Sequence, residues 1–301
     1  MIPGKKVLIL YYSQSGQLGE IVNNFLLPFE EAGVSVEKVN LKPKKDFDFP
    51  WTSKSFFDAM PESVLGIPVE LEEFELKETA YDLVIFGYQP WFLSPSIPAS
   101  SILLNSKIKK ILKDTPVVTI IGARNMWLNS QEKVKKLLRD AEAKLVGNIA
   151  LTDKNGNLVS AVTIQYWLFT GRKDKFLNIF PKPGVSEKDI SGVKIFGEKV
   201  LQALKEGSWN SLQEKLVALK ALEVKPNLMF IESRGSKIFK IWAKVIIKRK
   251  NRSLWTQLFK FYLLIALFIV APIILLINTL IFQPFLGKVI NKKKEYYLGL
   301  N

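Results

Sequence analysis

The stretch VLILYYSQSGQLGEIVNNF, residues 7–25, decides the fold, because it reads as a buried strand followed by a helix. The segment VLILYY is apolar or aromatic without polar alternation, which is typical of a strand buried on both faces of a parallel sheet. The loop between strand and helix, SQSGQL, carries two serines and a glycine. Its composition raises the question of whether it binds a phosphate or only turns the chain.

The same alternation continues along the chain and predicts an α/β fold. We expect strands at 6–12, 35–41, 82–87, 117–122 and 146–152, and helices at 18–32, 100–113 and 130–144. Strands that alternate with helices predict a doubly wound, parallel, five-stranded sheet. After a turn at Asn155 and Gly156 we expect a further strand at 158–167. A helix capped by Ser186 and stopped by Gly207 follows, and then a helix at 212–222.

The loop SQSGQL lies where open α/β sheets bind ligands, at the carboxyl end of a strand. Ser13 and Ser15 offer hydroxyls, Gly16 lets the backbone approach a ligand, and the start of the helix offers free N–H groups to an anion. The loop has no lysine, as a P-loop requires, and it has only Gly16 and Gly19 of a dinucleotide fingerprint. What remains is the flavodoxin style of FMN phosphate loop, with these predicted contacts: Ser13, Gln14, Ser15, Gly16, Gln17 and Leu18.

Two further loops follow neighbouring strands of the predicted sheet. GYQPWFLSPSIP presents a rigid aromatic surface suited to a flat ring, with predicted contacts from Gln89, Pro90, Trp91, Phe92 and Leu93. GARNMW supplies polar groups from Gly122, Arg124 and Asn125. Each loop taken alone is equally consistent with a purely structural turn. Together, at one edge of one sheet, the three loops predict that the cofactor is FMN.

These residues resemble a known family. ILYYSQSGQL resembles the phosphate loop of flavodoxin-like proteins, and YQPWFLSPSIPASSIL resembles the ring-binding loop of FMN-dependent quinone reductases. With its aromatic insert and apolar tail, the chain is similar to the dialkylresorcinol condensing enzyme family of dialkylresorcinol and flexirubin pigment biosynthesis. That resemblance implies an FMN-dependent aromatase that oxidises a 2,5-dialkylcyclohexane-1,3-dione to a dialkylresorcinol. It also implies a ketosynthase and an acyl carrier protein as partners.

The composition limits the catalytic groups. The chain has no cysteine and no histidine, which excludes thiolate nucleophiles, histidine bases and the usual zinc sites, so we expect no metal. Arg124 or Asn125 is a weak candidate to stabilise an enolate, and Tyr88 or Tyr166 to relay a proton. Two other functions stay open, an NAD(P)H-dependent quinone reductase and a membrane-tethered electron carrier. A homodimer is expected only by analogy with quinone reductases.

The charge of the chain is concentrated in its tail. Of the net charge of +15, residues 235–301 carry +11, from 12 basic residues and one acid. The tail includes FYLLIALFIVAPIILLINTLIF, residues 261–282, which has 22 residues and no charge. At about 1.5 Å per residue such a helix is roughly 33 Å long, close to the thickness of a bilayer core. We therefore expect a lipid membrane as the partner of the tail rather than nucleic acid.

These patterns divide the chain as follows. We expect an FMN-binding domain at 1–207 with a long aromatic insert at 43–77, a helical linker at 208–236, an amphipathic interfacial helix at 237–253, a membrane segment at 258–286 and a basic tail at 287–301. The apolar stripe of the amphipathic helix comprises Ile238, Ile241, Trp242, Val245 and Ile246. Whether the membrane segment spans or lies in the bilayer stays open, since Pro272 near its centre is typical of a break in a helix. Its orientation also stays open, because basic residues flank both ends. The large domain is expected in the cytoplasm.

Overall fold

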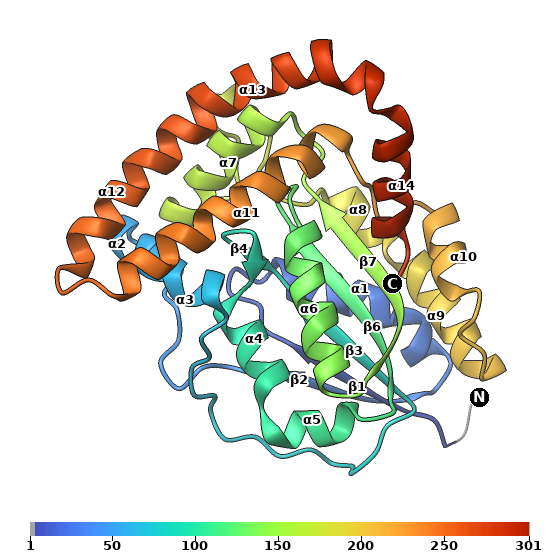
Figure 1. The fold of residues 1–301 in the computed structure, drawn as a ribbon. Helices are drawn as coiled ribbons and strands as arrows, with labels where there is room; N and C mark the ends of the chain where they lie inside the picture. Colours follow the sequence, from blue (N-terminus) through green and yellow to red (C-terminus); the bar gives the residue numbers. More distant parts are fainter. Residues whose placement is uncertain (1–3, 301) are drawn as a thin grey trace.

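A five-stranded, fully parallel sheet lies at the centre of the computed structural model, which describes residues 4–300 except the side chain of Phe282 (Figure 1). The strand order is β2–β1–β3–β6–β7. The bounds are β1 (Lys6–Tyr11), β2 (Ser35–Asn40), β3 (Leu83–Tyr88), β6 (Pro116–Ala123) and β7 (Lys144–Thr152). Counted within this sheet alone the order is 2-1-3-4-5, which is the flavodoxin-like order of doubly wound sheets. The predicted fold class is confirmed.

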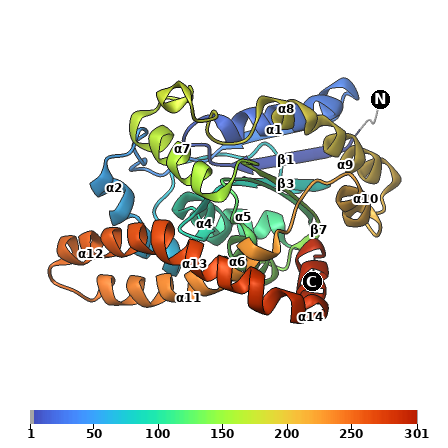
Figure 2. The same ribbon diagram turned by 90° about the horizontal axis from the view of Figure 1, so that it is seen from above.

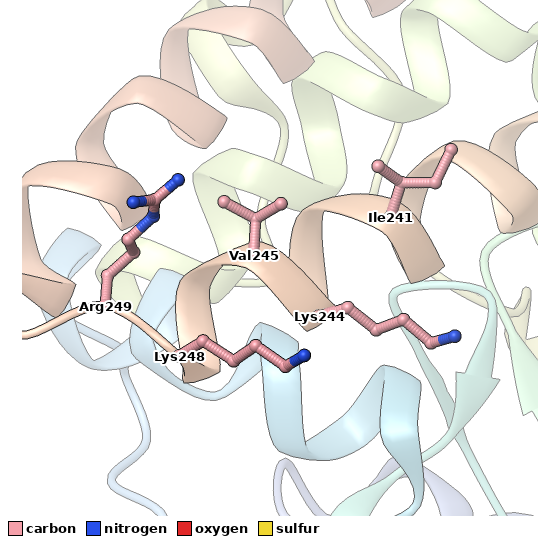
Figure 3. A pocket seen from close by; sticks show the side chains of 5 residues that line it. All are labelled: Ile241, Lys244, Val245, Lys248 and Arg249. Atoms are coloured by element: carbon pink, nitrogen blue, oxygen red, sulfur yellow. The ribbon is translucent and has the colours of Figure 1, made fainter.

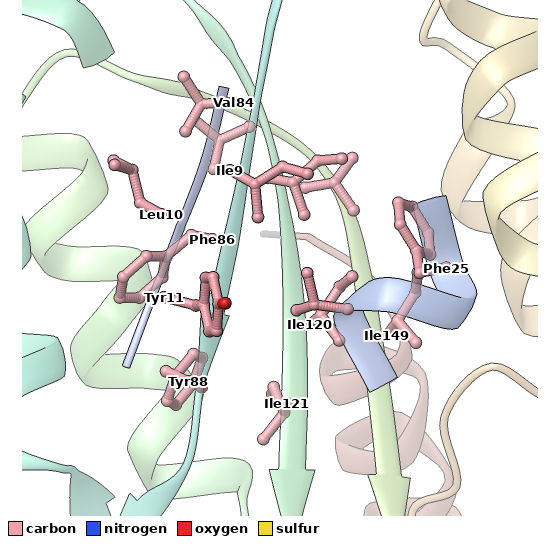
Figure 4. Close-up of a cluster of buried hydrophobic side chains, with 14 of the residues drawn as sticks. Ile9, Leu10, Tyr11, Phe25, Val84, Phe86, Tyr88, Ile120, Ile121 and Ile149 are labelled. Atoms are coloured by element: carbon pink, nitrogen blue, oxygen red, sulfur yellow. The ribbon is translucent and has the colours of Figure 1, made fainter. Parts of the chain in front are cut away.

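Helices cover both faces of the sheet (Figure 2). One face carries α1 (Gln17–Glu31), α8 (Glu187–Gly192) and α9 (Lys194–Glu206), and the other carries α4 (Ile97–Leu104), α5 (Ser106–Leu112) and α6 (Leu128–Asp140). Fully buried side chains such as Ile9, Phe25, Ile120 and Ile149 fill the space between α1 and the sheet (Figure 4). Gly197 lets α9 approach α1 closely, since a Cβ there would lie 2.1 Å from the carbonyl oxygen of Phe25.

Four predicted elements differ in the structure. The expected strand at 158–167 is wrong, because these residues lie within helix α7 (Asn157–Thr170). The expected helix at 100–113 is two helices, because the side chain of Asn105 caps α5 by accepting from the N–H groups of Lys107 and Ile108. The helix expected from Ser186 to Gly207 is also two helices, α8 and α9, which meet at Val193. The Ser186 cap is confirmed at the start of α8, since its hydroxyl accepts from Asp189 N at 3.1 Å. Gly207 ends α9 in the left-handed conformation, as expected, and the helix expected at 212–222 ends earlier, as α10 (Leu212–Ala218).

The aromatic insert lies between the sheet domain and the C-terminal tail and packs against the tail. It contains α2 (Ser53–Asp58) and α3 (Met60–Leu65), which pack against α11 (Pro226–Ile247) and α12 (Arg252–Ile265). A second apolar core forms between the two segments, from Phe57, Met60, Val64, Phe239, Ala243, Ile246 and Phe259. The insert is therefore the surface on which the tail packs, and its aromatic side chains Phe49, Trp51, Phe56 and Phe57 also line a cavity.

α11 crosses the boundary expected at 236/237, and one side of it packs on the insert through Phe239, Ala243 and Ile246. Ile246, part of the stripe expected to face the membrane, is therefore buried within the protein, whereas Ile241 of the same stripe is 63% exposed. The hollow in Figure 3, about 410 Å³ in volume, lies on the outer surface of α11. Its walls combine Ile241 and Val245 with three basic side chains: Lys244, Lys248 and Arg249.

The apolar segment Arg252–Ile281 is helical throughout, and it is long and apolar enough to cross a membrane. It comprises α12, a π-helical turn at Ala266–Val270, α13 (Ala271–Ile277) and the start of a second π-helical turn at Asn278–Phe282. The chain then passes through a short turn at Gln283–Phe285 into α14 (Gly287–Leu298). Arg252 pairs with Glu62 of the insert at one end of the segment, and Thr279 Oγ1 donates to Asn227 Oδ1 of α11 at 3.4 Å near the other. Beyond the segment, Tyr296 Oη of α14 donates to Glu132 at 2.7 Å. The chain therefore contacts the rest of the protein near both ends of the segment and again in α14.

Candidate functional site

A cavity of about 610 Å³ lies at the carboxyl ends of β1, β3 and β6, within the range of small-molecule and cofactor sites. Its walls come from the three predicted loops, the aromatic insert, α7, α11 and the apolar segment. Most of the predicted contacts line it: Gln14, Ser15, Gln17, Leu18, Gln89, Pro90, Trp91, Phe92, Leu93, Gly122 and Arg124. Among the described residues that line it, Arg124 and Lys260 are the only charged side chains.

The loop after β1 is arranged to present its backbone. Gly16 has a φ of 87°, in the left-handed region that favours glycine, and it immediately precedes α1. Ser13 does not line the cavity, because its hydroxyl accepts from Gly19 N at 3.1 Å within the loop. The earlier N–H groups of the first turn of α1 remain available to a ligand, as at any helix start. Gly16, like Ser13, does not itself line the cavity. A helix start that follows a left-handed glycine is a geometry that suits anions, so the loop is compatible with the predicted phosphate.

Gln14 and Gln17 hold the loop against distant segments. Gln14 Oε1 accepts from Trp51 Nε1 of the insert at 3.1 Å. Gln17 exchanges two hydrogen bonds with the backbone of Val185, each 3.1 Å long. Gly184 is required beside it, because a Cβ there would lie 2.8 Å from Gln17 Oε1. Both glutamines line the cavity, but these bonds already engage their side-chain groups, so their direct share in ligand binding is limited.

The ring-binding loop forms a small antiparallel hairpin, β4 (Pro90–Trp91) and β5 (Ser94–Pro95). Its two tip residues, Phe92 and Leu93, have φ values of 47° and 59°. Such left-handed conformations cost non-glycine residues on the order of 1 kcal/mol or more and are found preferentially at functional sites. The Phe56 ring packs at 4.7 Å from that of Phe92, and Trp51 packs edge-on to Trp91 at 5.2 Å, measured between ring centroids. The insert thus supports the hairpin from outside.

Arg124 and Asn125, which follow β6, share one anchor on α7. Arg124 donates to the side-chain oxygen of Asn157 at 3.1 Å, and Asn125 Nδ2 donates to the same oxygen at 2.8 Å. Burial lowers the pKa of Arg124 to about 10, so the guanidinium stays charged at neutral pH. Asn125 does not line the cavity, and within the described part of the chain its Oδ1 is buried without a hydrogen-bond partner.

The two tyrosines expected to relay protons lie outside the cavity wall. Tyr88 is fully buried and donates to Gln131 Oε1 at 2.7 Å, and burial raises its pKa well above the ordinary value. Tyr166 donates to Asp174 at 2.8 Å on the exposed side of α7. Neither hydroxyl is directed at the space where a ligand would bind, so we assign no proton relay to them.

The sequence patterns missed the far wall of the cavity. α7 contributes Ala161, Ile164, Gln165, Trp167, Leu168 and Phe169, and the tail contributes Ile231, Gly235, Phe239, Lys260, Tyr262, Leu263, Leu264, Ala266, Leu267 and Ala271. Gly235 permits the contact between tail and hairpin, because a Cβ there would lie 3.1 Å from Leu93 Cδ1. The only available signal was Lys260, an isolated charge within an apolar run.

Glu232 of α11 connects the tail to the loop that carries Arg124. It is 1% exposed, and its Oε1 accepts from Asn129 N, in the first turn of α6, at 2.7 Å. Among the described groups its Oε2 has no partner. Burial raises the pKa of Glu232 from 4.5 to about 7. The carboxyl group is therefore half-protonated near neutral pH in the folded protein.

This shift predicts a pH-dependent stability. Between pH 4.5 and 7 the folded protein retains a proton that the unfolded chain releases, so the free energy of unfolding falls as the pH rises, by about 3 kcal/mol in total. Glu232→Gln should remove this fall, as measured by urea denaturation at pH 5 and pH 8. Glu214→Gln, at an exposed site on α10, should leave it unchanged. Equal slopes in wild type and Glu232→Gln would contradict the assignment.

Comparison with known proteins finds relatives of fold alone. No family model matches the chain, and no curated protein matches it in sequence. Among solved structures, a flavoprotein from Lactobacillus acidophilus NCFM in complex with FMN is 18% identical, with a TM-score of 0.40, over 49% of this chain and 93% of that one. Flavodoxin 1 from Bacillus cereus is 13% identical, with a TM-score of 0.35, over 66% and 98%. A flavone reductase is 11% identical, with a TM-score of 0.35, over 67% and 63%.

Proposed function

We propose that the protein is a membrane-associated, FMN-dependent oxidoreductase that acts on a lipophilic ring substrate. The observation that carries the proposal is the cavity, which joins the three loops of a flavodoxin-like ligand site to the apolar segment of the tail. Ordinary ligand pockets of such sheets need no apolar helix from outside the sheet. A wall built from that helix is suited to an apolar substrate placed beside the cofactor.

The residues present fit FMN on two grounds. The loop at Gly16 offers backbone donors at a helix start, which suits a phosphate held without lysine. The hairpin at Trp91 presents apolar and aromatic surface suited to a flat ring. In this proposal Ser15, Gly16 and Leu18 hold the phosphate end, and Trp91 and Phe92 the ring.

We further propose that the substrate is a 2,5-dialkylcyclohexane-1,3-dione, which the enzyme converts to a dialkylresorcinol. The conversion removes two electrons and two protons from the ring, and bound FMN supplies the electron acceptor. The charged Arg124 lies in the cavity wall, where it stabilises negative charge on the enolate oxygen. Because cyclic 1,3-diones lose a proton readily, water suffices as the base. A ketosynthase working with an acyl carrier protein would supply the dione.

The tail supports membrane association with the apolar segment lying in the plane of the interface. One side of the segment lines the cavity, and the other exposes a row of apolar side chains: Leu258, Phe261, Ile265, Ile269, Leu276 and Leu280. The segment contacts the insert at Arg252 and α11 at Thr279, and α14 beyond it contacts α6 through Tyr296, whereas a spanning helix would place its ends on opposite sides of the bilayer. The basic hollow on α11 suits anionic headgroups at that surface.

Anaerobic spectroscopy tests the reaction. We expect the 2,5-dialkylcyclohexane-1,3-dione to bleach the visible absorbance of the FMN-loaded protein, with the resorcinol detected by mass spectrometry. Bleaching by NADPH but not by the dione would favour the quinone reductase instead. If neither compound reduces the bound flavin, the electron carrier is the better description. A protein that takes up no FMN contradicts the proposal as a whole.

A further inference from the structure

Lys260 is an isolated charge in the apolar segment. Between Ser253 and Gly287 it is the only charged residue. A lysine in such a helix ordinarily extends its amine toward the aqueous interface. Lys260 instead lines the cavity, half-buried, and its Nζ donates to Ser53 Oγ of α2 at 3.0 Å. The side chain is therefore held between the tail and the insert, at the wall of the ligand space.

No carboxylate neutralises this ammonium group within the described part of the chain. Asp58, on the same helix as Ser53, is engaged elsewhere, since it pairs with Lys54 and accepts from Thr256 Oγ1 at 3.2 Å. An ammonium group has three donors, and only one is used by Ser53. A cation partly removed from water without a counter-ion is costly, and an anionic ligand would offset that cost.

The side chains around Lys260 indicate the chemical class of the anion that it would bind. Neighbouring positions of the same helix that line the cavity are apolar or aromatic: Tyr262, Leu263, Leu264, Ala266 and Leu267. From α11, Phe239 lies in the same wall. One positive charge among apolar side chains fits a molecule with a single negative oxygen-bearing head and an alkyl chain. A neutral lipid or a highly charged nucleotide would match this wall less well.

We infer that Lys260 and Ser53 form an oxyanion subsite that binds the lipophilic substrate as its monoanion. The inference rests on the proposed function and adds to it that the enolate, rather than the neutral dione, is the bound form. In this assignment Arg124 stabilises negative charge on the enolate oxygen. Lys260 selects the anionic form of the substrate at the membrane side of the cavity. Lys260 is a specificity-determining residue in this assignment, and its charge is required rather than its length.

The test uses a ligand that binds without reacting. In 2-butyl-5,5-dimethylcyclohexane-1,3-dione the quaternary ring carbon blocks aromatisation, and its enol methyl ether is a neutral counterpart. Calorimetry with the FMN-loaded full chain at pH 8 should show the dione binding at least about tenfold more tightly than the ether. Lys260→Met should weaken binding of the dione about tenfold and leave the ether unchanged, and Lys260→Arg should retain most of the preference.

Matched variants keep the inference falsifiable. Lys205→Met, at an exposed position of α9, should bind both ligands as the wild type does. If Lys260→Met does not fold, Ser53→Ala still tests the subsite, with an expected loss of about threefold for the dione alone. Equal dione affinity in Lys260→Met and wild type overturns the inference. If the protein takes up no FMN, the proposed function is refuted. The subsite is then tested independently, because the affinities of the dione and the ether can still be compared on the FMN-free chain.

Discussion

Ser15→Asp should abolish the retention of FMN, with a fall in affinity of more than 100-fold. Ser15 lines the cavity in the loop between β1 and α1, where we place the phosphate. A carboxylate about 4 Å from a phosphate oxygen repels it by roughly 4 kcal/mol per pair of unit charges at an effective dielectric constant near 20. The nearest cationic group of the cavity wall belongs to another loop, so nothing within SQSGQL offsets that repulsion. Visible absorbance after gel filtration measures retention, and fluorescence titration measures affinity.

Ser15→Asn is the matched control, since asparagine has nearly the shape of aspartate without its charge. It should lose less than about tenfold in affinity, because an uncharged side chain adds no repulsion of this kind. Circular dichroism should show the same helix content in both variants, since Ser15 lies outside the packed core. A Ser15→Asp protein that remains yellow would mean that the phosphate binds at another loop.

The inner strands of the sheet, β1, β3 and β6, were predictable because they are largely apolar. β1 and β3 are buried along nearly their whole length, and runs of Val, Ile and Leu indicate such strands without an alignment. The meeting of the three loops followed from the same pattern, because parallel strands end at one edge of a sheet. Residues predicted to follow the ends of these strands, such as Ser15, Trp91 and Arg124, therefore line one cavity.

α7 was mistaken for a strand for a physical reason. The segment NLVSAVTIQYWLFT is rich in β-branched and aromatic residues and shows no clear helical periodicity, because apolar residues such as Leu158 also stand on its exposed side. Its first residue, Asn157, holds both Arg124 and Asn125. That contact joins segments more than 30 residues apart in sequence, and no local pattern predicts it.

The apolar segment shows a different limit of sequence patterns. Length and hydropathy indicate a membrane segment but do not say which side of the helix faces protein. In the structure Leu263 and Leu267 line the cavity, whereas Phe261 and Ile265 are more than half exposed. The packing of α11 and α12 on the insert determines which side of the segment lines the cavity and which side is exposed. The role of the tail in the ligand site thus depends on tertiary contacts that begin at α2 and α3.

The second large effect that we expect is a loss of membrane binding when the exposed side of this segment is substituted. Ile269 and Leu276 are 56% and 61% exposed, and neither lines the cavity. Each substitution removes the burial of one large apolar side chain in the lipid, which contributes roughly 1.5–3 kcal/mol, and adds a charge that anionic lipid repels. Ile269→Asp/Leu276→Asp should therefore reduce binding to vesicles that contain anionic lipid by more than 100-fold, as measured by flotation. Leu27→Asp/Ile195→Asp adds the same charge to exposed apolar sites on α1 and α9 and should still float.

The same vesicles distinguish a segment that lies in the interface from one that spans it. The chain has no cysteine, so Asn291→Cys in α14 provides a single reactive thiol. When the protein is added to preformed vesicles, the domain stays outside, and Tyr296 holds α14 against it through Glu132. The thiol should therefore react fully with a membrane-impermeant maleimide. Protection of the thiol until detergent is added would show that the segment crosses the bilayer, and the in-plane arrangement, with the cavity open to one leaflet, would have to be abandoned.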